Sequence, residues 1–439
     1  MKMKLKILPI LAGVLNIYYA SAQQVKFTEY DLNNGLHVIM HQDKSAPVVT
    51  VSVMYHVGSK DEIPTRTGFA HFFEHLLFEG SDNMKRGDFM KIVSSNGGQN
   101  NANTTNDRTF YYESFPSNQL ELGLWLESER MLHPKIDETG VKTQNEVVKE
   151  EKRLRIDNRP YSKYNEVISK KMFDGHPYSW QVIGSMPDLD AATLDEFKAF
   201  FKKYYVPSNA VLTIAGDIDL QLTKALVSKY FDEIPKAIPL VKPVFILKPI
   251  TKEIVDTVFD GNIQVPAIFA AYRIPGVKSK ESTALSMLST LLSGGGSSRL
   301  GTKMIDLKKT AVQVGAYNMT MEDYGLYTTL ALPSGSSSLD NLLKDIDAEI
   351  ENVQNELISE NEFKKLRNQF ESKSISANAS MLGIAENLAT AYTFHDKNTN
   401  RINEELKEVQ SVTREDIREV ARKYLRKESR IVLYYLPKK

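Results

Sequence analysis

An internal repeat constrains the fold of this chain more than any other feature. Residues 193–214 run from Thr-Leu-Asp-Glu-Phe through Lys-Tyr to Val-Leu-Thr-Ile, and residues 413–434 follow the same pattern at a constant offset of 220 residues. Each copy opens with Thr and acidic residues, which are typical of a capped helix N-terminus, and closes with an apolar run typical of a strand. The sequence therefore predicts two copies of one structural unit.

The front parts of the two halves match more loosely. Apolar segments at 47–55 and 266–272 predict strands, and each precedes an apolar helical segment that ends in Gly, at 66–80 and about 281–294. Because strands and helices alternate, we expect an α/β or α+β chain in which helices cover the sheets.

Between the halves, segment 235–249 holds four prolines separated by Lys and aliphatic residues. Proline lacks the backbone N–H that a helix interior uses, so this spacing excludes a regular helix and predicts a linker. The expected domains are therefore 23–234 and 250–439, and the length of 439 residues fits two domains of ordinary size.

The N-terminus predicts a secretory signal peptide over residues 1–22. Three lysines precede an apolar run at about 7–17, and Ala20-Ser21-Ala22 follows as an A-x-A cleavage site. The alternative is an uncleaved anchor, but the run is shorter than the roughly 20 residues of a spanning helix. We expect an exported protein, most simply in a bacterial periplasm, without a stable membrane span.

Composition excludes several classes of function. Lys and Arg number 55 and Asp and Glu also number 55, so no basic excess marks the chain as a binder of nucleic acid or anionic membrane. The chain has no Cys, which excludes disulfides, cysteine nucleophiles and thiolate metal sites. Any metal must therefore be held by His, Asp or Glu.

One segment carries the chemistry: His71-Phe-Phe-Glu74-His75. Residues four apart on a helix share a face, so the two imidazoles can point at one ion. Zinc in catalytic sites takes three protein ligands and water, and an adjacent carboxylate such as Glu74 can accept a proton from that water. The H-x-x-E-H order is the inverse of the common zinc-protease helix.

A third metal ligand is expected from another helix. The segment 143–155 predicts a helix with three candidate carboxylates, and spacing alone does not choose between Glu146, Glu150 and Glu151. A mixed acidic and basic helix of this kind is by default a solvated face.

These residues, together with Gly58-Ser-Lys-Asp-Glu62 and Val147-Val-Lys-Glu-Glu151-Lys-Arg, resemble the pitrilysin–insulinase family of zinc peptidases, and most of all its short, mitochondrial-processing-peptidase-like bacterial members. The resemblance runs from about residue 25 to the C-terminus. It implies an α+β class with two homologous domains, each a mostly antiparallel sheet covered by helices, which together form half of a clamshell.

The resemblance also implies the roles of individual residues. His71, His75 and Glu151 would bind Zn²⁺, and Glu74 would activate the water. Gln144 stands where many relatives carry another Glu near the metal, so this position departs from the family pattern.

A Gly turn opens the stretch 97–104, and the Thr and aromatic residues that follow at 107–112 predict a strand. By itself this is an ordinary edge strand. In the family, however, the strand borders the active site and peptide substrate pairs with it edge to edge, a mode that tolerates many sequences because main chain supplies the contacts. The resemblance therefore implies four substrate-binding residues: Asn101, Ala102, Asn103 and Thr104.

The second half lacks the metal motif. Aligning Leu291-Leu292 with Leu76-Leu77 places Ser286, Ser289 and Thr290 where His71, Glu74 and His75 stand, so we expect one metal per chain. In the family this half commonly supplies an Arg and a Tyr to the substrate carbonyl. The expected positions hold Asp306 and Val312, and only a shifted alignment recruits Arg299 and Tyr317.

The sequence thus predicts a zinc-dependent endopeptidase that cleaves peptides or unfolded segments inside a clamshell chamber. The missing Arg and Tyr predict a heterodimer, in which a related subunit without zinc supplies them; a homodimer is the alternative. The rival functions are a non-catalytic core-type subunit and a peptide-binding protein with a vestigial zinc site.

Overall fold

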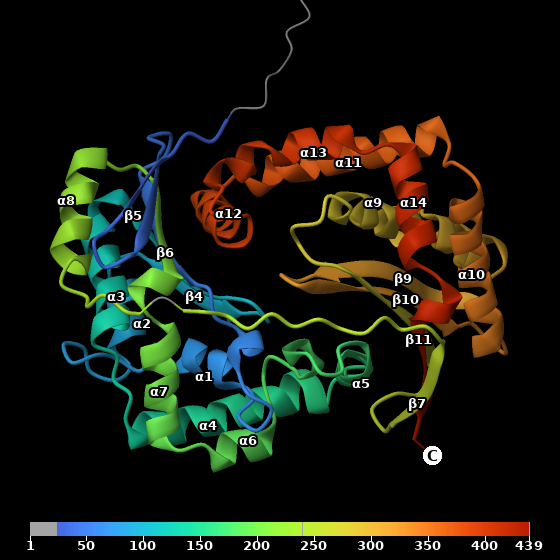
Figure 1. The fold of residues 1–439 in the computed structure, drawn as a ribbon, viewed down its shortest axis with the longest axis horizontal. Helices are drawn as coiled ribbons and strands as arrows, with labels where there is room; N and C mark the ends of the chain where they lie inside the picture. Colours follow the sequence, from blue (N-terminus) through green and yellow to red (C-terminus); the bar gives the residue numbers. More distant parts are fainter. Residues whose placement is uncertain (1–23, 239, 439) are drawn as a thin grey trace, which may run out of the picture.

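The computed structural model describes residues 24–238 and 240–438, and the predicted signal peptide lies outside these ranges. The described residues form two sheets, each flanked by helices (Figure 1). None of the described helices combines the length and the hydropathy that crossing a bilayer requires.

The first sheet has six strands in the order β1-β2-β6-β3-β5-β4. Strands β2 and β6 run parallel, and the other neighbours run antiparallel. The strands are β1 (Thr28–Asp31), β2 (His37–Gln42), β3 (Val48–Tyr55), β4 (Gln99–Thr104), β5 (Thr109–Pro116) and β6 (Ala210–Gly216).

The second sheet has five strands in the order β7-β11-β8-β10-β9, which repeats the order of the first sheet without a counterpart of β1. Only β7 and β11 run parallel in this sheet. The two antiparallel-dominated sheets confirm the expected α+β class. The strands are β7 (Ile254–Asp260), β8 (Ala267–Pro275), β9 (Ala311–Thr320), β10 (Tyr324–Pro333) and β11 (Arg430–Pro437).

Eight of the described α-helices precede the linker and six follow it. Those before the linker are α1 (Phe69–Leu76), α2 (Asp88–Ser95), α3 (Leu120–Leu132), α4 (Glu138–Lys152), α5 (Lys163–Met172), α6 (Met186–Ala191), α7 (Leu194–Tyr204) and α8 (Leu220–Phe231). Those after it are α9 (Ser282–Ser293), α10 (Leu339–Asn355), α11 (Glu360–Ala377), α12 (Met381–Phe394), α13 (Glu405–Ser411) and α14 (Arg414–Tyr424).

The predicted repeat appears as two helix–strand pairs, α7 with β6 and α14 with β11. Both helices begin with a capping box: Thr193 pairs reciprocally with Glu196, and Thr413 pairs with Asp416. Each box satisfies two backbone donors that the first helical turn leaves free, which is why the Thr-x-x-acid pattern marks the helix start.

Segment 235–249, the predicted linker, contains no helix or strand among its described residues. It crosses from the first sheet to the second as an extended strap (Figure 1). The division into domains 23–234 and 250–439 stays a prediction, because one helix of each half packs on the sheet of the other half.

That exchange of helices joins the halves. Helix α5 precedes the linker but packs on the second sheet, where Ile168 and Met172 share a buried cluster with Leu433 of β11. Helix α12 follows the linker but packs on the first sheet, where Leu388 shares a cluster with Met54 of β3. Each sheet is therefore covered on one face by its own half and on the other face partly by the opposite half.

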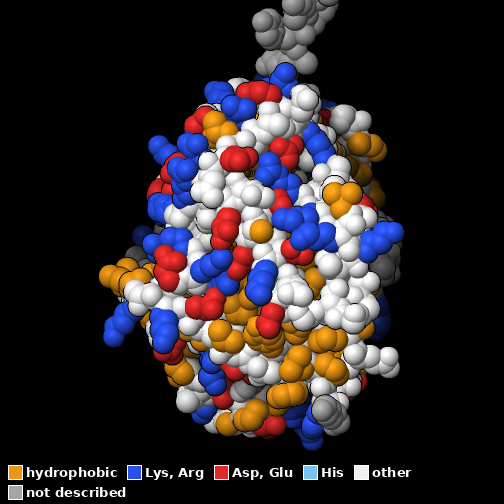
Figure 2. Space-filling model, turned by 90° about the vertical axis from the view of Figure 1, so that its right-hand side faces the viewer, with side chains coloured by type: hydrophobic (Ala, Val, Ile, Leu, Met, Phe, Trp, Pro, Cys, Tyr) orange, Lys and Arg blue, Asp and Glu red, His pale blue; other side chains and the backbone are white. Residues whose placement is uncertain are grey.

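One edge strand of the second sheet, β7, pairs on its outer side with no strand among the described residues. Strand β7 ends that sheet, and its Val255 and Phe259 side chains are exposed, whereas β1 covers the corresponding edge of the first sheet. Figure 2 shows this side of the molecule, with mixed charges in its upper part and hydrophobic side chains gathered in the lower part, the level at which β7 lies in Figure 1.

A fully buried arginine lies beneath the first sheet. Arg130 of α3 contacts the carboxylates of Glu127 and Glu113, the latter at 3.1 Å. The rings of Phe78, Phe89 and Tyr111 surround its guanidinium at 4.4–4.7 Å. Burial, and then the neighbouring Glu127, raise the pKa of Glu113 well above its ordinary value, whereas Arg130 opposes that shift.

We expect Arg130→Met to lower the free energy of unfolding by about 3–5 kcal/mol, because it leaves two buried carboxylates without their cation. Chemical denaturation followed by circular dichroism measures the change. Arg153→Met is the matched control: Arg153 pairs with Glu150 on the surface, and exposed pairs contribute only about 0–1 kcal/mol. Equal losses in the two variants would contradict the prediction.

Candidate active site

Helix α1, which carries His71, Glu74 and His75, begins later than the sequence indicates. The apolar pattern predicts a helix from residue 66, but α1 begins at Phe69, because Gly68 at its N-terminus has a left-handed φ of 93°. A Cβ on the neighbouring Gly184 would lie 2.4 Å from the carbonyl oxygen of Thr67. Two glycines therefore meet where the chain enters α1, and neither tolerates a side chain there.

A buried carboxylate caps this helix from outside. Glu62 accepts hydrogen bonds from the backbone N–H groups of Gly68 and Ala70, both at 2.9 Å. Gly68 has no side chain with which to cap the helix, so Glu62 satisfies two of its free donors. Burial raises the pKa of Glu62 above its ordinary value, and the two amide donors oppose the shift.

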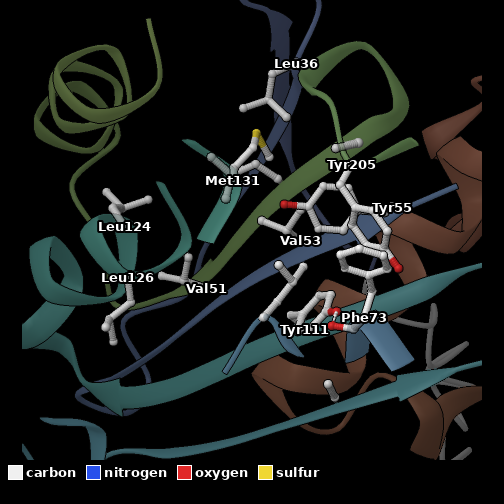
Figure 3. Packing of buried hydrophobic residues seen from close by; sticks show 14 of the residues in the cluster. Leu36, Val51, Val53, Tyr55, Phe73, Tyr111, Leu124, Leu126, Met131 and Tyr205 are labelled. Atoms are coloured by element: carbon white, nitrogen blue, oxygen red, sulfur yellow. Dashed lines mark hydrogen bonds between the residues drawn. The ribbon is translucent and has the colours of Figure 1, made fainter. Parts of the chain in front are cut away.

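Two buried tyrosines hold the backbone of α1 from the sheet side. Tyr111 of β5 donates to the carbonyl of Phe73 at 2.8 Å, and Tyr205 donates to the carbonyl of Ala70 at 3.3 Å. Figure 3 shows these rings gathered around Phe73 in the core. The helix is thus fixed at its start and along its buried face.

The structure brings His71, His75 and Glu151 together. Glu151 Oε2 lies 3.1 Å from His75 Nε2 and 3.5 Å from His71 Nε2. One ligand atom from each of the three residues lies within 4.8 Å of the others. Of the three carboxylates that spacing left open, Glu151 faces the histidines, whereas Glu146 and Glu150 pair with Lys149 and Arg153 on the surface.

The pKa values of His71 and Glu151 are shifted by their surroundings. Burial and then the neighbouring His75 lower the pKa of His71 to about 4. The His75 ring also lowers the pKa of Glu151. Arg155, one turn further along the chain, contacts the other carboxylate oxygen of Glu151 at 2.6 Å and leaves Oε2 directed at the imidazoles.

Glu74 lies beside this group with one oxygen held. Thr104, at the end of β4, donates to Glu74 Oε2 at 2.6 Å. Burial raises the pKa of Glu74, and the Thr104 hydrogen bond opposes that rise. The sequence placed Thr104 among the substrate-binding residues, and the structure links its hydroxyl to Glu74.

The register of α4 against α1 is set by polar contacts that the sequence analysis missed. Gln144 donates to the buried carboxylate of Glu79 at 2.5 Å, and Arg86 contacts Glu79 from the other side. Arg86 also reaches Asp137 at 2.8 Å, and Asp137 caps α4. Glu79 and Arg86 both follow the metal-ligand motif in sequence, but no spacing rule connects them with Gln144.

The predicted substrate strand is β4, at an edge of the first sheet. Asn101 accepts a hydrogen bond from the backbone N–H of Ala102 at 2.9 Å, and Asn103 accepts one from Arg108. Arg108 reaches across to Glu386 of α12 at 2.6 Å. The outer edge of β4 pairs with no strand among the described residues.

Most of the polar residues considered in the second half have their partners within that half, and Tyr317 is the exception because it contacts α5 of the first half. Ser286 and Thr290 bond backbone carbonyls of their own helix, and Ser289 also reaches Asn318 at 3.2 Å. Arg299 forms a two-point ion pair with Glu362 at 2.9 and 3.1 Å, and Tyr317 contacts the hydroxyl of Tyr164.

The positions expected to hold Arg and Tyr carry other residues. Asp306 belongs to the π-helical turn Gly301–Leu307, and Val312 is an exposed residue of β9.

A pocket of about 330 Å³ lies between the segment after α4 and the second sheet. The sequence analysis did not anticipate it, because its walls come from both halves of the chain. Arg155 links this pocket to Glu151. Its lining includes Arg155, Arg159, Tyr161, Tyr164, Phe269 and Tyr317.

Two protein-family models together match most of the chain. Residues 37–185 match the model described as "Insulinase (Peptidase family M16)", and residues 191–370 match "Peptidase M16 inactive domain". The first match contains His71, Glu74, His75 and Glu151, and the second contains the half that lacks them.

Individual relatives agree with this result. The zinc protease PqqE of Helicobacter pylori is 31% identical over 352 residues, which cover 80% of this chain and 79% of that protein. The crystal structure of a protease from Helicobacter pylori matches 94% of this chain and all of its own, with a TM-score of 0.88 and 29% identity.

A third match shows the same fold in a longer chain. The periplasmic protease PqqL of Escherichia coli is 19% identical with a TM-score of 0.78, and the match covers 94% of this chain but 48% of PqqL. The family models and the extent of the PqqE match together show that this chain belongs to the insulinase family of peptidases, M16.

Proposed function

We propose that this chain is a zinc-dependent endopeptidase whose metal is held by His71, His75 and Glu151. The observation that carries the proposal is the convergence of two imidazole Nε2 atoms on one carboxylate oxygen. Glu151 Oε2 is buried, and no donor among the described residues reaches it with hydrogen-bond geometry. Two neutral imidazoles and a carboxylate are the donor set that catalytic zinc takes.

In this proposal Glu74 is the general base. Zinc in such a site lowers the pKa of bound water towards about 7 and polarises the scissile carbonyl. Because Thr104 holds Oε2 of Glu74, the other oxygen is free to accept the proton of the attacking water. Glu74 then returns that proton to the leaving amine.

Substrate would bind along β4 as an added strand. Asn101, Ala102, Asn103 and Thr104 supply an edge whose last residue already contacts Glu74. Backbone pairing suits peptides or unfolded segments of varied sequence. The aromatic pocket beside Arg155 offers a place for a substrate side chain close to Glu151.

The domain plan belongs to the same proposal. Residues 23–234 would form the zinc-binding domain, 235–249 the linker and 250–439 a related domain without metal, together half of a clamshell. PqqL, a periplasmic protease of which this chain matches about half, supports an assembly of two such halves and an exported location.

A second subunit would complete the chamber. Asp306 and Val312 stand at the expected Arg and Tyr positions, and Arg299 is committed to Glu362. The donors that stabilise the developing oxyanion would therefore come from a related chain without zinc, because a second copy of this chain carries the same Asp306 and Val312. Loss of one such donor costs about 2.7–4 kcal/mol of transition-state stabilisation.

Metal analysis tests the ligand set. The purified chain is expected to retain one zinc ion after dialysis, and Glu151→Gln is expected to weaken retention because it removes an anionic ligand. Elemental analysis and chelator competition measure both. Glu150→Gln is the matched control, since Glu150 lies on the same helix and faces Arg153. A requirement for Glu150 instead of Glu151 would refute the assignment.

Hydrolysis of a quenched fluorescent peptide library tests Glu74. The Glu74→Gln variant is expected to keep its zinc and to lose about 10²–10⁴-fold in kcat, the usual contribution of a general base. Glu146→Gln, an exposed carboxylate of α4, serves as control. If the zinc-loaded wild type, together with its partner, binds peptides but does not hydrolyse them, the peptide-binding alternative is favoured.

Native mass measured together with activity tests the subunit prediction. We expect full activity in a complex with a related chain that carries the Arg and Tyr, and weak activity in the isolated chain. A fully active monomer or homodimer would overturn the heterodimer proposal but leave the zinc site intact.

A further inference from the structure

A buried cluster of charges joins the two halves away from the metal ligands. Lys60 is 8% exposed, and its Nζ lies 2.5 Å from Glu322 Oε2. The same atom lies 3.3 Å from both Asp107 Oδ1 and Asp323 Oδ2. Glu322 and Asp323 form the tip of the hairpin between β9 and β10, which belongs to the half without the metal motif.

Further hydrogen bonds hold the hairpin tip against the first half. They join backbone as well as side-chain atoms, so the tip is fixed in position and not only attracted by charge. The contacts are Glu322 N to Asp107 Oδ2 at 2.9 Å, Asp323 N to Tyr178 Oη at 3.1 Å, Glu322 Oε2 with His56 Nε2 at 2.9 Å, and Asp323 Oδ2 with His176 Nε2 at 3.2 Å.

Lys60 belongs to the short 3-10 turn Ser59–Asp61, which is docked on the loop between β4 and β5. The backbone N–H of Lys60 donates to the carbonyl of Asn106 at 2.8 Å. A Cβ on Gly58 would lie 2.4 Å from backbone atoms of Asn106, so this close approach requires glycine. Turn, loop and hairpin therefore form one tightly fitted junction.

Two segments of this junction, the turn at Lys60 and the loop after β4, continue to the candidate site. Two residues after Lys60, Glu62 caps the helix that carries His71 and His75. The docked loop continues from β4, whose Thr104 holds Glu74. A displacement of the turn would move the cap, and a displacement of the loop would move the partner of the general base.

We propose that the β9–β10 hairpin positions the metal-binding helix through Lys60, so that the half without metal acts on the site of the other half. Lys60 is thereby a positioning residue, and it touches neither metal nor substrate. The inference rests on the proposed function for its consequences in catalysis, but not for its effect on α1. Removal of the ammonium leaves three carboxylates together at the junction, and the turn must move to hydrate them.

The experiment compares Glu322→Gln and Lys60→Met with Lys229→Met, a lysine whose pair with Glu121 lies on the surface. Hydrogen exchange is measured for the segment containing residues 67–76 in metal-free protein, and zinc affinity is measured by chelator competition. We expect faster exchange in α1 and roughly 3- to 30-fold weaker zinc binding in both junction variants, and no change in the control.

Glu322→Gln keeps the shape of the side chain and can still hydrogen-bond, so it serves as the test if Lys60→Met does not fold. The double variant is expected to lose less than the two single losses combined, because both changes break one contact. Junction variants that lower the melting temperature while α1 exchange and zinc affinity stay at wild-type values would overturn the proposal.

The two proposals fail differently. If the wild type binds no zinc, the proposed function fails, whereas the exchange of α1 still reports the junction. If zinc binds normally in the wild type and α1 does not respond to Glu322→Gln, the junction proposal alone fails.

Discussion

Helix α1 begins at a glycine without a capping side chain, and the carboxylate of Glu62, six residues upstream, takes the place of one. Together with the left-handed φ of Gly68, this buried group fixes where the helix starts, and so it helps to set which way the histidines point. It depends in turn on close backbone contacts at Gly58 and Gly184 that exclude any Cβ. The chemistry proposed for Glu74 is thus built on a loop that carries none of the reacting groups.

The two halves stabilise each other by exchanging helices. Helix α12 covers the first sheet and α5 covers the second, so neither sheet buries both faces with its own half alone. The half without metal ligands therefore contributes part of the buried surface of the half that has them. Hydrophobic contacts join the halves, and the hydrogen-bonded charges around Lys60 add contacts of defined geometry, because hydrogen bonds are directional and apolar contacts are not.

Much of the architecture could be predicted from local pattern. The capping boxes at Thr193 and Thr413 and the apolar strands that follow them lie where the sequence indicates, because their signals come from neighbouring residues. The start of α1 was wrong by three residues, since the left-handed φ of Gly68 and its distant cap leave no periodic signal. The exchange of α5 and α12 could not be predicted either, because the amphipathic pattern of a helix does not indicate which sheet its apolar face will cover.

In the candidate site, the pair His71 and His75 and the adjacent Glu74 could be identified from their spacing, since residues four apart on a helix lie within reach of one ion. The sequence left three carboxylates open on α4 until the family resemblance favoured Glu151. Three contacts became visible only in the folded chain: Glu151 faces the imidazoles, Thr104 donates to Glu74, and Gln144 donates to Glu79. The physical reason is that each of these contacts joins elements far apart in the chain, and their distances are set by how helices and sheets pack, which no local pattern records.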